Sequence, residues 1–118
     1  MIKIPADIKI YLSIEPIHMN KSFDGLAALV HDKLNQNPLS GHLFVFRNRR
    51  SDKIKFLYWD RNGFIQIYKR LEKGRFKFPK LTEFTHLVIS PQELELLLDG
   101  IDIVKLKRLP ELEYKAVV

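Results

Sequence analysis

The dipeptide Asn62-Gly63, which separates two mainly apolar runs, constrains the fold of this chain more than any other feature of its sequence. Asn and Gly both tolerate positive φ, so Asn-Gly between two such runs is the strongest short-range signal for a β-hairpin. We therefore expect strands over residues 54–60 and 64–71, joined by a two-residue loop. In that register Trp59 and Gln66 are cross-strand neighbours.

The two faces of this hairpin differ in character. Opposed residues share a face, so one face mixes aromatic and cationic side chains, namely Lys55, Leu57, Trp59, Arg61, Phe64, Gln66, Tyr68 and Arg70. The rings of Trp59 and Tyr68 can stack on bases while cations hold phosphates. The alternative is that a helix covers this face and buries its apolar side chains, with the cations at the margin. The opposite face is more apolar and predicts a core.

Hydrophobic periodicity predicts the remaining strands. Apolar and other residues alternate over residues 8–12, which is typical of a strand. Short apolar runs predict further strands over residues 42–47, 75–78 and 86–89.

Two helices are expected, each with its own start signal. Asn20 or Ser22 can cap the first, whose buried face has helical spacing and consists of Phe23, Leu26, Ala27, Val30 and Leu34. Ser90 to Glu93 reads as a capping box with proline at the first helical position. The order of elements predicts an α+β fold, with a mostly antiparallel sheet of about five strands packed by two helices.

Length and composition fit one domain in a reducing compartment. With 118 residues, 46% of them hydrophobic, the chain can bury a core. We expect a single domain over residues 1–103 and leave residues 104–118 as an unassigned tail. No apolar run approaches the ~20 residues of a membrane span, and the first residues do not resemble a signal peptide. The absence of cysteine suits the cytoplasm, where we expect the protein.

Positive charge is concentrated in the middle of the chain. Residues 47–80 hold 12 of the 20 lysines and arginines and only three acids, a net charge of +9, whereas the rest carries −3. Such a segment attracts polyanions and speeds encounter with them. The alternative is a solvated face that only keeps the protein soluble.

The sequence predicts no enzyme active site. The four histidines lack the spacing that places two ligands on one metal, and no phosphate-binding glycine motif is present. We therefore expect no catalytic residue, metal, cofactor or small-molecule substrate. A small metal-independent ribonuclease that uses Arg, Lys, Tyr and His on a sheet stays open, because no motif would reveal it.

Four segments carry a resemblance to a known family. They are MNKSFDGLAALV (19–30), SGHLFVFRNRRSDKIKFLYWDRNGF (40–64), YKRLEKGRFKFP (68–79) and LLLDGID (96–102). Together they resemble the TnpB-type accessory protein of the insertion-sequence-sixty-six family of bacterial transposable elements, over about residues 1–103. The RNA-guided nuclease of the same name is a different protein. Two positions depart from the family, which often has glycine at Ser51 and tryptophan at Phe78.

The resemblance implies a role in transposition beside a separate, larger transposase that holds the catalytic acids. Our first hypothesis is a non-catalytic accessory subunit that binds DNA through Arg47, Arg49, Arg50, Lys53, Lys55, Arg70, Lys73 and Arg75. The second is an adaptor that docks on the transposase, with exposed aromatic residues such as Trp59 and Tyr68 at the interface. The ribonuclease is the third.

Overall fold

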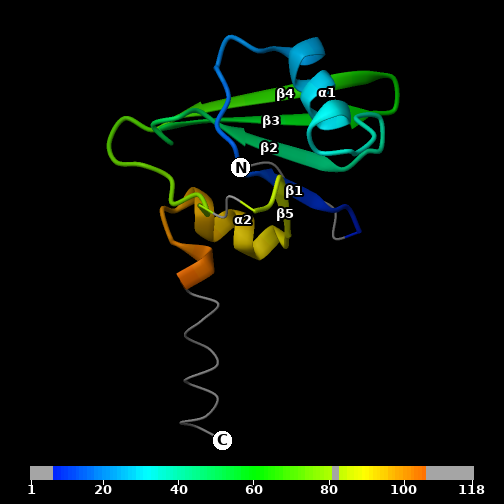
Figure 1. Ribbon diagram of the computed structural model, residues 1–118. Helices are drawn as coiled ribbons and strands as arrows, with labels where there is room; N and C mark the ends of the chain where they lie inside the picture. The colour runs from blue at the N-terminus through cyan, green and yellow to red at the C-terminus, as the bar shows by residue number, and fades with distance from the viewer. Residues whose placement is uncertain (1–6, 81–82, 106–118) are drawn as a thin grey trace, which may run out of the picture.

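A five-stranded sheet with one helix on each face forms the molecule (Figure 1). The computed structural model describes residues 7–80 and 83–105. The strands are β1 (Ile10–Ser13), β2 (Leu43–Arg47), β3 (Lys53–Asp60), β4 (Gly63–Arg70) and β5 (His86–Ile89). The helices are α1 (Phe23–Asp32) and α2 (Pro91–Leu98). In the described part of the chain, neither helix has the length and apolar character that a membrane crossing requires.

The strand order is β4-β3-β2-β1-β5, and one pair is parallel. β1 runs parallel to β2 because α1 connects them as a crossover, while the other three pairs are antiparallel. This confirms the predicted α+β fold and its mostly antiparallel sheet. The division into a domain over residues 1–103 and a tail stays a prediction, since residues 106–118 lie outside the described part.

Two hydrophobic cores lie on opposite faces of the sheet. β2 serves both, because alternate residues of a strand point to opposite faces: Leu43 and Val45 pack towards α2, whereas Phe44 and Phe46 pack towards α1. All four are buried. Strands buried on both faces read as continuous apolar runs, which is why residues 42–47 show no alternation.

Both helices begin where the sequence predicts. α2 has a full capping box: Glu93 N donates to Ser90 Oγ at 3.1 Å, and Ser90 N donates to Glu93 Oε1 at 2.9 Å. α1 starts after Ser22, whose hydroxyl bonds Gln66 on β4 instead of capping the helix. Its predicted core residues Leu26, Val30 and Leu34 are buried, but Phe23 is exposed.

The hairpin exists, but its predicted register is wrong. Asp60 pairs with Gly63, so the two-residue loop is Arg61-Asn62 and Gly63 begins β4. Arg61 takes the left-handed conformation, with φ 55. A positive φ is costly for a residue with a Cβ, so local preference favoured Asn-Gly in the loop. The ladder between β3 and β4 overrides that preference.

The register error leaves the two faces unchanged. Trp59 lies opposite Phe64, and Gln66 opposite Leu57, so the predicted Trp59–Gln66 pair is displaced by one step of two residues. Since side chains alternate with a period of two, a displacement of two keeps every residue on its predicted face.

The strand expected over residues 75–78 is absent. The segment is extended but joins no ladder. Phe76 and Phe78 are buried, whereas Arg75 and Lys77 are exposed. This alternation produces the strand-like pattern, although the segment runs over the α2-side core instead of pairing with the sheet.

Candidate nucleic-acid interface

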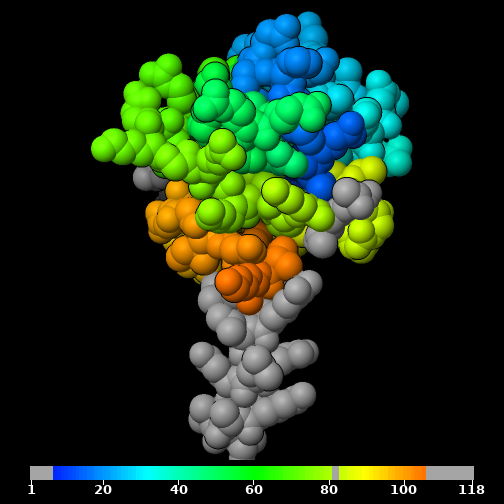
Figure 2. All heavy atoms as spheres, turned by 60° about the vertical axis from the view of Figure 1, so that its left-hand side comes forward, coloured from blue at the N-terminus to red at the C-terminus, as the bar shows by residue number. Residues whose placement is uncertain are grey.

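Basic segments meet at the end of the sheet where β2 turns into β3. The turn, residues 48–52, is joined to the chain that follows β4 by two backbone hydrogen bonds. Leu71 N donates to Asp52 O at 2.8 Å, and Phe76 N donates to Ser51 O at 2.7 Å. This end faces the viewer in Figure 2, where green, yellow-green and orange parts of the chain share one surface. Residues 73–77 therefore lie at the same end as the turn, as the sequence hypothesis requires.

The β2–β3 turn is held by the side chain of Asn48. Its Oδ1 accepts from the backbone N–H groups of Asp52 and Lys53 at 3.1 and 3.0 Å, and its Nδ2 donates to Asp52 Oδ1 at 2.6 Å. The bond from Asn48 lowers the pKa of the Asp52 carboxyl. Ser51 has φ 58, a left-handed conformation that glycine adopts more readily than residues with a Cβ. The bonded turn carries Arg49 and Arg50 as exposed side chains.

A groove of about 670 Å³ runs beside this turn. We call it the basic groove. Six exposed cations from three parts of the chain line it, namely Arg49, Arg50, Arg75, Lys77, Lys80 and Lys105. The buried Arg47 also lines it, and Asp102 is the one acid among its described lining residues. Within residues 7–80 and 83–105, none of these six forms an ion pair. Among the described residues that line it, the groove is therefore strongly positive, with Asp102 as its single acid.

Arg47 has a structural role rather than a free guanidinium. It is 9% exposed, and its Nη2 and Nε donate to the carbonyl of Ile14 at 2.9 and 3.2 Å. Its Nη1 donates to Ser51 Oγ at 3.3 Å, and its guanidinium lies 5.6 Å from the centre of the Phe78 ring. Burial, and secondarily Arg49, lowers the pKa of Arg47. Because these donors have partners inside the fold, Arg47, a predicted DNA contact, is not part of the interface that we propose below.

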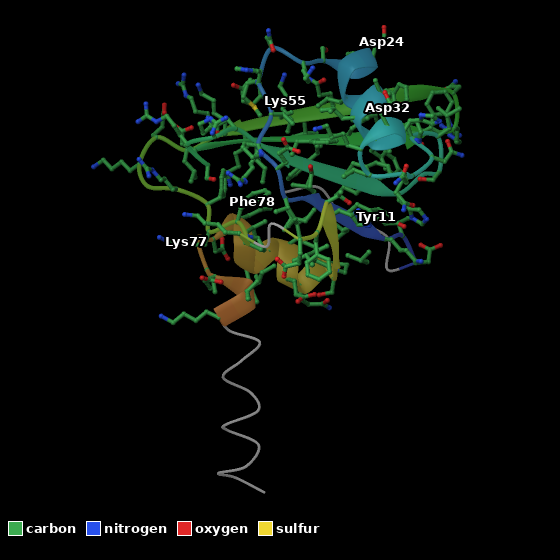
Figure 3. The ribbon with its side chains drawn as sticks, in the orientation of Figure 1. Tyr11, Asp24, Asp32, Lys55, Lys77 and Phe78 are labelled. Carbon is green, nitrogen blue, oxygen red and sulfur yellow. The ribbon has the colours of Figure 1, made fainter. Side chains whose placement is uncertain are left out.

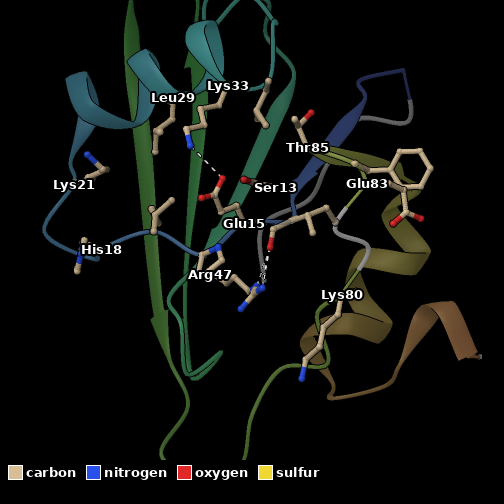
Figure 4. Close-up of a pocket in the computed structure, with 15 residues that line it drawn as sticks. Ser13, Glu15, His18, Lys21, Leu29, Lys33, Arg47, Lys80, Glu83 and Thr85 are labelled. Carbon is tan, nitrogen blue, oxygen red and sulfur yellow. Dashed lines mark hydrogen bonds and ion pairs between the residues drawn. The ribbon is translucent and has the colours of Figure 1, made fainter.

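A second hollow, of about 760 Å³, lies on the other side of Arg47, between the end of α1 and the strand ends of β1 and β5 (Figure 4). Its apolar lining includes Ile14, Leu29 and Phe84. Lys33 is bonded to Glu15 across part of it, at 3.2 Å. This hollow is less basic than the groove and suits a different class of ligand.

Lys55 is also structural. The side chain is 4% exposed and extends under the segment that precedes α1 (Figure 3). Its Nζ donates to the carbonyls of Met19 and Lys21, the latter at 2.6 Å. Burial lowers the pKa of its ammonium group. Lys55 therefore ties the entry of α1 to β3, and this predicted DNA contact is likewise not part of the interface that we propose below.

The other predicted cations remain accessible. Arg49, Arg50, Lys73 and Arg75 are exposed, and Lys53 is half-buried. Arg70 forms an exposed ion pair with Glu72, with Nη2 3.1 Å from Oε1. Exposed pairs of this kind contribute little to stability and exchange readily, so Arg70 can still reach an anion.

The two aromatic residues singled out in the hairpin lie apart. Trp59 packs edge-to-face on Phe64, with ring centroids 5.0 Å apart, near the Arg61-Asn62 loop. Tyr68 lies opposite Lys55, four residues further along β3, or about 13 Å at the usual strand rise. Tyr68 is half-exposed and Trp59 largely covered. The structure does not bring these residues together in one site.

Lys77, Lys80 and Lys105 line the groove but were not in the predicted contact set. Exposed Arg75 and Lys77 alternate with buried Phe76 and Phe78. This period of two in the sequence could have placed Lys77 beside Arg75. Lys105 comes from a segment far along the chain, and only the tertiary fold brings it to the groove. Among the described residues, no group of three or more His, Asp or Glu side chains is arranged to hold a metal ion.

Comparison with known proteins gives a consistent result. Residues 8–108 match the family model described as "IS66 Orf2 like protein". Among curated proteins, the uncharacterized protein y4jC of Sinorhizobium fredii (strain NBRC 101917 / NGR234) is 37% identical over 110 residues, covering 93% of both chains. The uncharacterized protein y4hO of the same strain is 36% identical over 102 residues, 86% of this chain and 88% of its own. No solved structure matches significantly.

Proposed function

The chain belongs to the family of IS66 Orf2-like proteins, accessory proteins of an insertion-sequence family, and from this premise we propose that it binds duplex DNA through its basic groove during transposition. The observation that carries the proposal is the convergence of cations from residues 49–50, 75–80 and 105 on one groove, where they form no ion pair among the described residues. Such a surface binds phosphates by releasing the counterions of the nucleic acid.

The lining of the groove favours phosphate contacts over base contacts. Its aromatic residues, Phe76 and Phe78, are buried and so do not offer a ring to a base. Arg49 and Arg50 are exposed on a turn, where their guanidinium groups can reach phosphates. Phosphate contacts position a protein without reading sequence. The proposed role is therefore to hold element DNA beside the transposase, which carries the catalytic chemistry.

A protein–protein adaptor is the second candidate function. Phe84, just before β5, and Val88, within it, are exposed by 51% and 52%. Among the described residues β5 is an edge strand of the sheet, and Phe84 also lines the hollow shown in Figure 4. Exposed apolar residues beside an open strand edge are typical of interaction surfaces. On this hypothesis the β5 edge contacts the transposase, while the basic groove stays free.

Affinity for duplex DNA at several salt concentrations tests the first function. Each lost phosphate contact should flatten the slope of log K against log salt by roughly 0.9. Arg49→Ala with Arg50→Ala should therefore weaken binding and flatten the slope by up to about twice that value. A matched control is Lys9→Ala with Arg61→Ala, which removes the same charge from exposed positions at the opposite end of the sheet.

If both double variants show the same dependence of duplex affinity on salt, only the net charge of the protein matters, and the groove is not the binding site. The adaptor hypothesis would be favoured if Arg49→Ala with Arg50→Ala leaves DNA affinity unchanged and the Phe84→Ala protein no longer retains the transposase in a pull-down. The DNA should be recovered uncut with magnesium, with manganese and with neither. Metal-independent cleavage of RNA that is lost with one Arg, Tyr or His would instead revive the ribonuclease.

A further inference from the structure

α1 covers the aromatic and cationic face of the hairpin unevenly. Leu57, near the middle of β3, is fully buried against α1, whereas Tyr68 on β4 is 50% exposed. The sequence allows two alternatives for this face, an exposed binding surface or a surface covered by a helix, and each is true of one part of it. The helix buries the part over β2 and β3, and the part of β4 towards the basic end stays open.

Tyr68 lies among cations on this open part. Its ring centre is 5.1 Å from Lys55 Nζ, and a cation at this distance attracts the face of an aromatic ring. Lys55, which is itself bonded to two backbone carbonyls, lies over one face of the ring, so a base would stack on the other face. Lys53 and Arg70, which pair with each other across the ladder, come next along the same face, within reach of Tyr68.

The cations continue from Tyr68 to the tip of the sheet. Lys53 lines a hollow of about 280 Å³ between residues 16–19 and the β2–β3 turn, together with Arg49 and Arg50. Met19, whose carbonyl accepts from Lys55, lines the same hollow. An extended polyanion lying on Tyr68 thus meets positive side chains at Arg70, Lys53 and the turn.

This surface differs chemically from the basic groove. The groove offers cations over buried phenylalanines, while the Tyr68 surface offers a half-exposed ring between cations. A ring flanked by cations on a sheet is the arrangement that binds unpaired bases, because any base can stack on it while the cations hold the backbone. Bases in a duplex are stacked on each other and are not available to such a ring.

We propose that the surface formed by Tyr68, Lys53 and Arg70 binds single-stranded DNA, with a base stacked on Tyr68. This inference rests on the proposed DNA-binding function and adds a second, strand-selective site to it. The β2–β3 turn lies between the two surfaces, because Arg49 and Arg50 line both the basic groove and the hollow that Lys53 lines. The protein would then favour DNA in which a duplex continues into an unpaired strand.

Binding of one fluorescent oligonucleotide, single-stranded and as its duplex, tests this site. Tyr68→Ala should weaken binding of the single strand about 5- to 150-fold and keep the affinity for the duplex within about twofold of wild type. Tyr68→Phe keeps the ring and should bind both forms like wild type. Phe84→Ala, which removes an equally exposed ring at the other edge of the sheet, is the matched control and should change neither. A Tyr68→Trp variant should show quenched fluorescence with the single strand only.

The outcomes separate the two proposals. If the duplex binds with the dependence on Arg49 and Arg50 described above, but Tyr68→Ala binds the single strand like wild type, the stacking site is wrong and the groove stands. If Tyr68→Ala weakens both forms equally, Tyr68 is not strand-selective and the inference fails. If wild type binds neither form, the proposed function fails first. Far-UV circular dichroism and urea midpoints of the variants confirm that each compared protein is folded.

Discussion

Arg47 and Lys55 are cations that the fold buries, and among the described residues neither forms an ion pair. Removing a charge from water is expensive unless its donors find partners. Both side chains meet this cost by donating to backbone carbonyls, Arg47 to Ile14 and Lys55 to Met19 and Lys21. The two residues fasten the segment between β1 and α1 to the sheet, which shapes one side of its basic end.

Replacing Arg47 should therefore affect folding more than binding. We expect Arg47→Met to lower the free energy of unfolding by about 1–3 kcal/mol, because the Ile14 carbonyl loses its donors. Arg50→Ala, at an exposed position, should change stability by under about 0.5 kcal/mol but weaken duplex binding. Urea denaturation and DNA titration of both variants, under conditions where each is folded, provide the measurement. A stable Arg47→Met protein with the larger loss of DNA affinity would contradict this division.

At the scale of elements, the β3–β4 hairpin shows that a sheet ladder can override a strong turn signal. Gly63 lies in β4, its φ is outside the left-handed region, and a Cβ added there would meet nothing within 4 Å. Arg61, not glycine, adopts positive φ in the loop. The eight residue pairs of the β3–β4 ladder, with Leu57 and Phe56 buried on opposite faces, outweigh the cost of one strained residue.

The register predicts opposite effects for two glycine substitutions. Gly63→Ala should leave stability unchanged or raise it by up to about 1 kcal/mol, since alanine loses less entropy than glycine in a strand. Gly100→Ala should lower stability by about 1–2 kcal/mol, because Gly100 ends α2 with φ +85. Chemical denaturation of both variants checks this. A loss at Gly63 as large as at Gly100 would place Gly63 in the loop after all.

At the scale of the whole molecule, one sheet joins two cores. The core on the α2 side and the core on the α1 side share β1, β2 and β3. Neither helix can leave without exposing a face of the same strands. We therefore expect the described part of the chain to unfold as one cooperative unit.

A substitution on one side of the sheet should thus be detected on the other. Leu97→Ala in α2, where Leu97 is fully buried, should lower the free energy of unfolding by about 2–5 kcal/mol. Trp59, the single tryptophan, lies on the α1 side and reports the shift by fluorescence. Its transition should coincide with that seen by circular dichroism. A Trp59 transition left unmoved by Leu97→Ala would show two independent units. Leu39→Ala, at an exposed position, is the control.

Features that depend on near neighbours in the chain could be predicted before the fold was known. The helix that follows the Ser90 cap, the buried positions of α1 and the two faces of the hairpin follow from capping residues and from periodicities of 3.6 and 2. The period of two over residues 75–78 instead predicted a strand that the sheet does not contain. The face assignment survived an error in register because a shift of two residues keeps parity. The concentration of positive charge in residues 47–80 was visible for the same reason, since it is a property of consecutive residues.

Features that depend on contacts between distant residues could not be predicted in this way. The parallel pairing of β1 with β2 and the arrival of Lys105 at the basic groove require the folded chain. The burial of Arg47 and Lys55 depends on carbonyls more than 30 residues away. The exposure of Tyr68 depends on how far α1 reaches across the sheet. The burial of a side chain depends on all residues around it in space, and many of these are far away in the sequence. The fold therefore determines which of these similar cations and aromatic rings are buried and structural and which are accessible to a ligand.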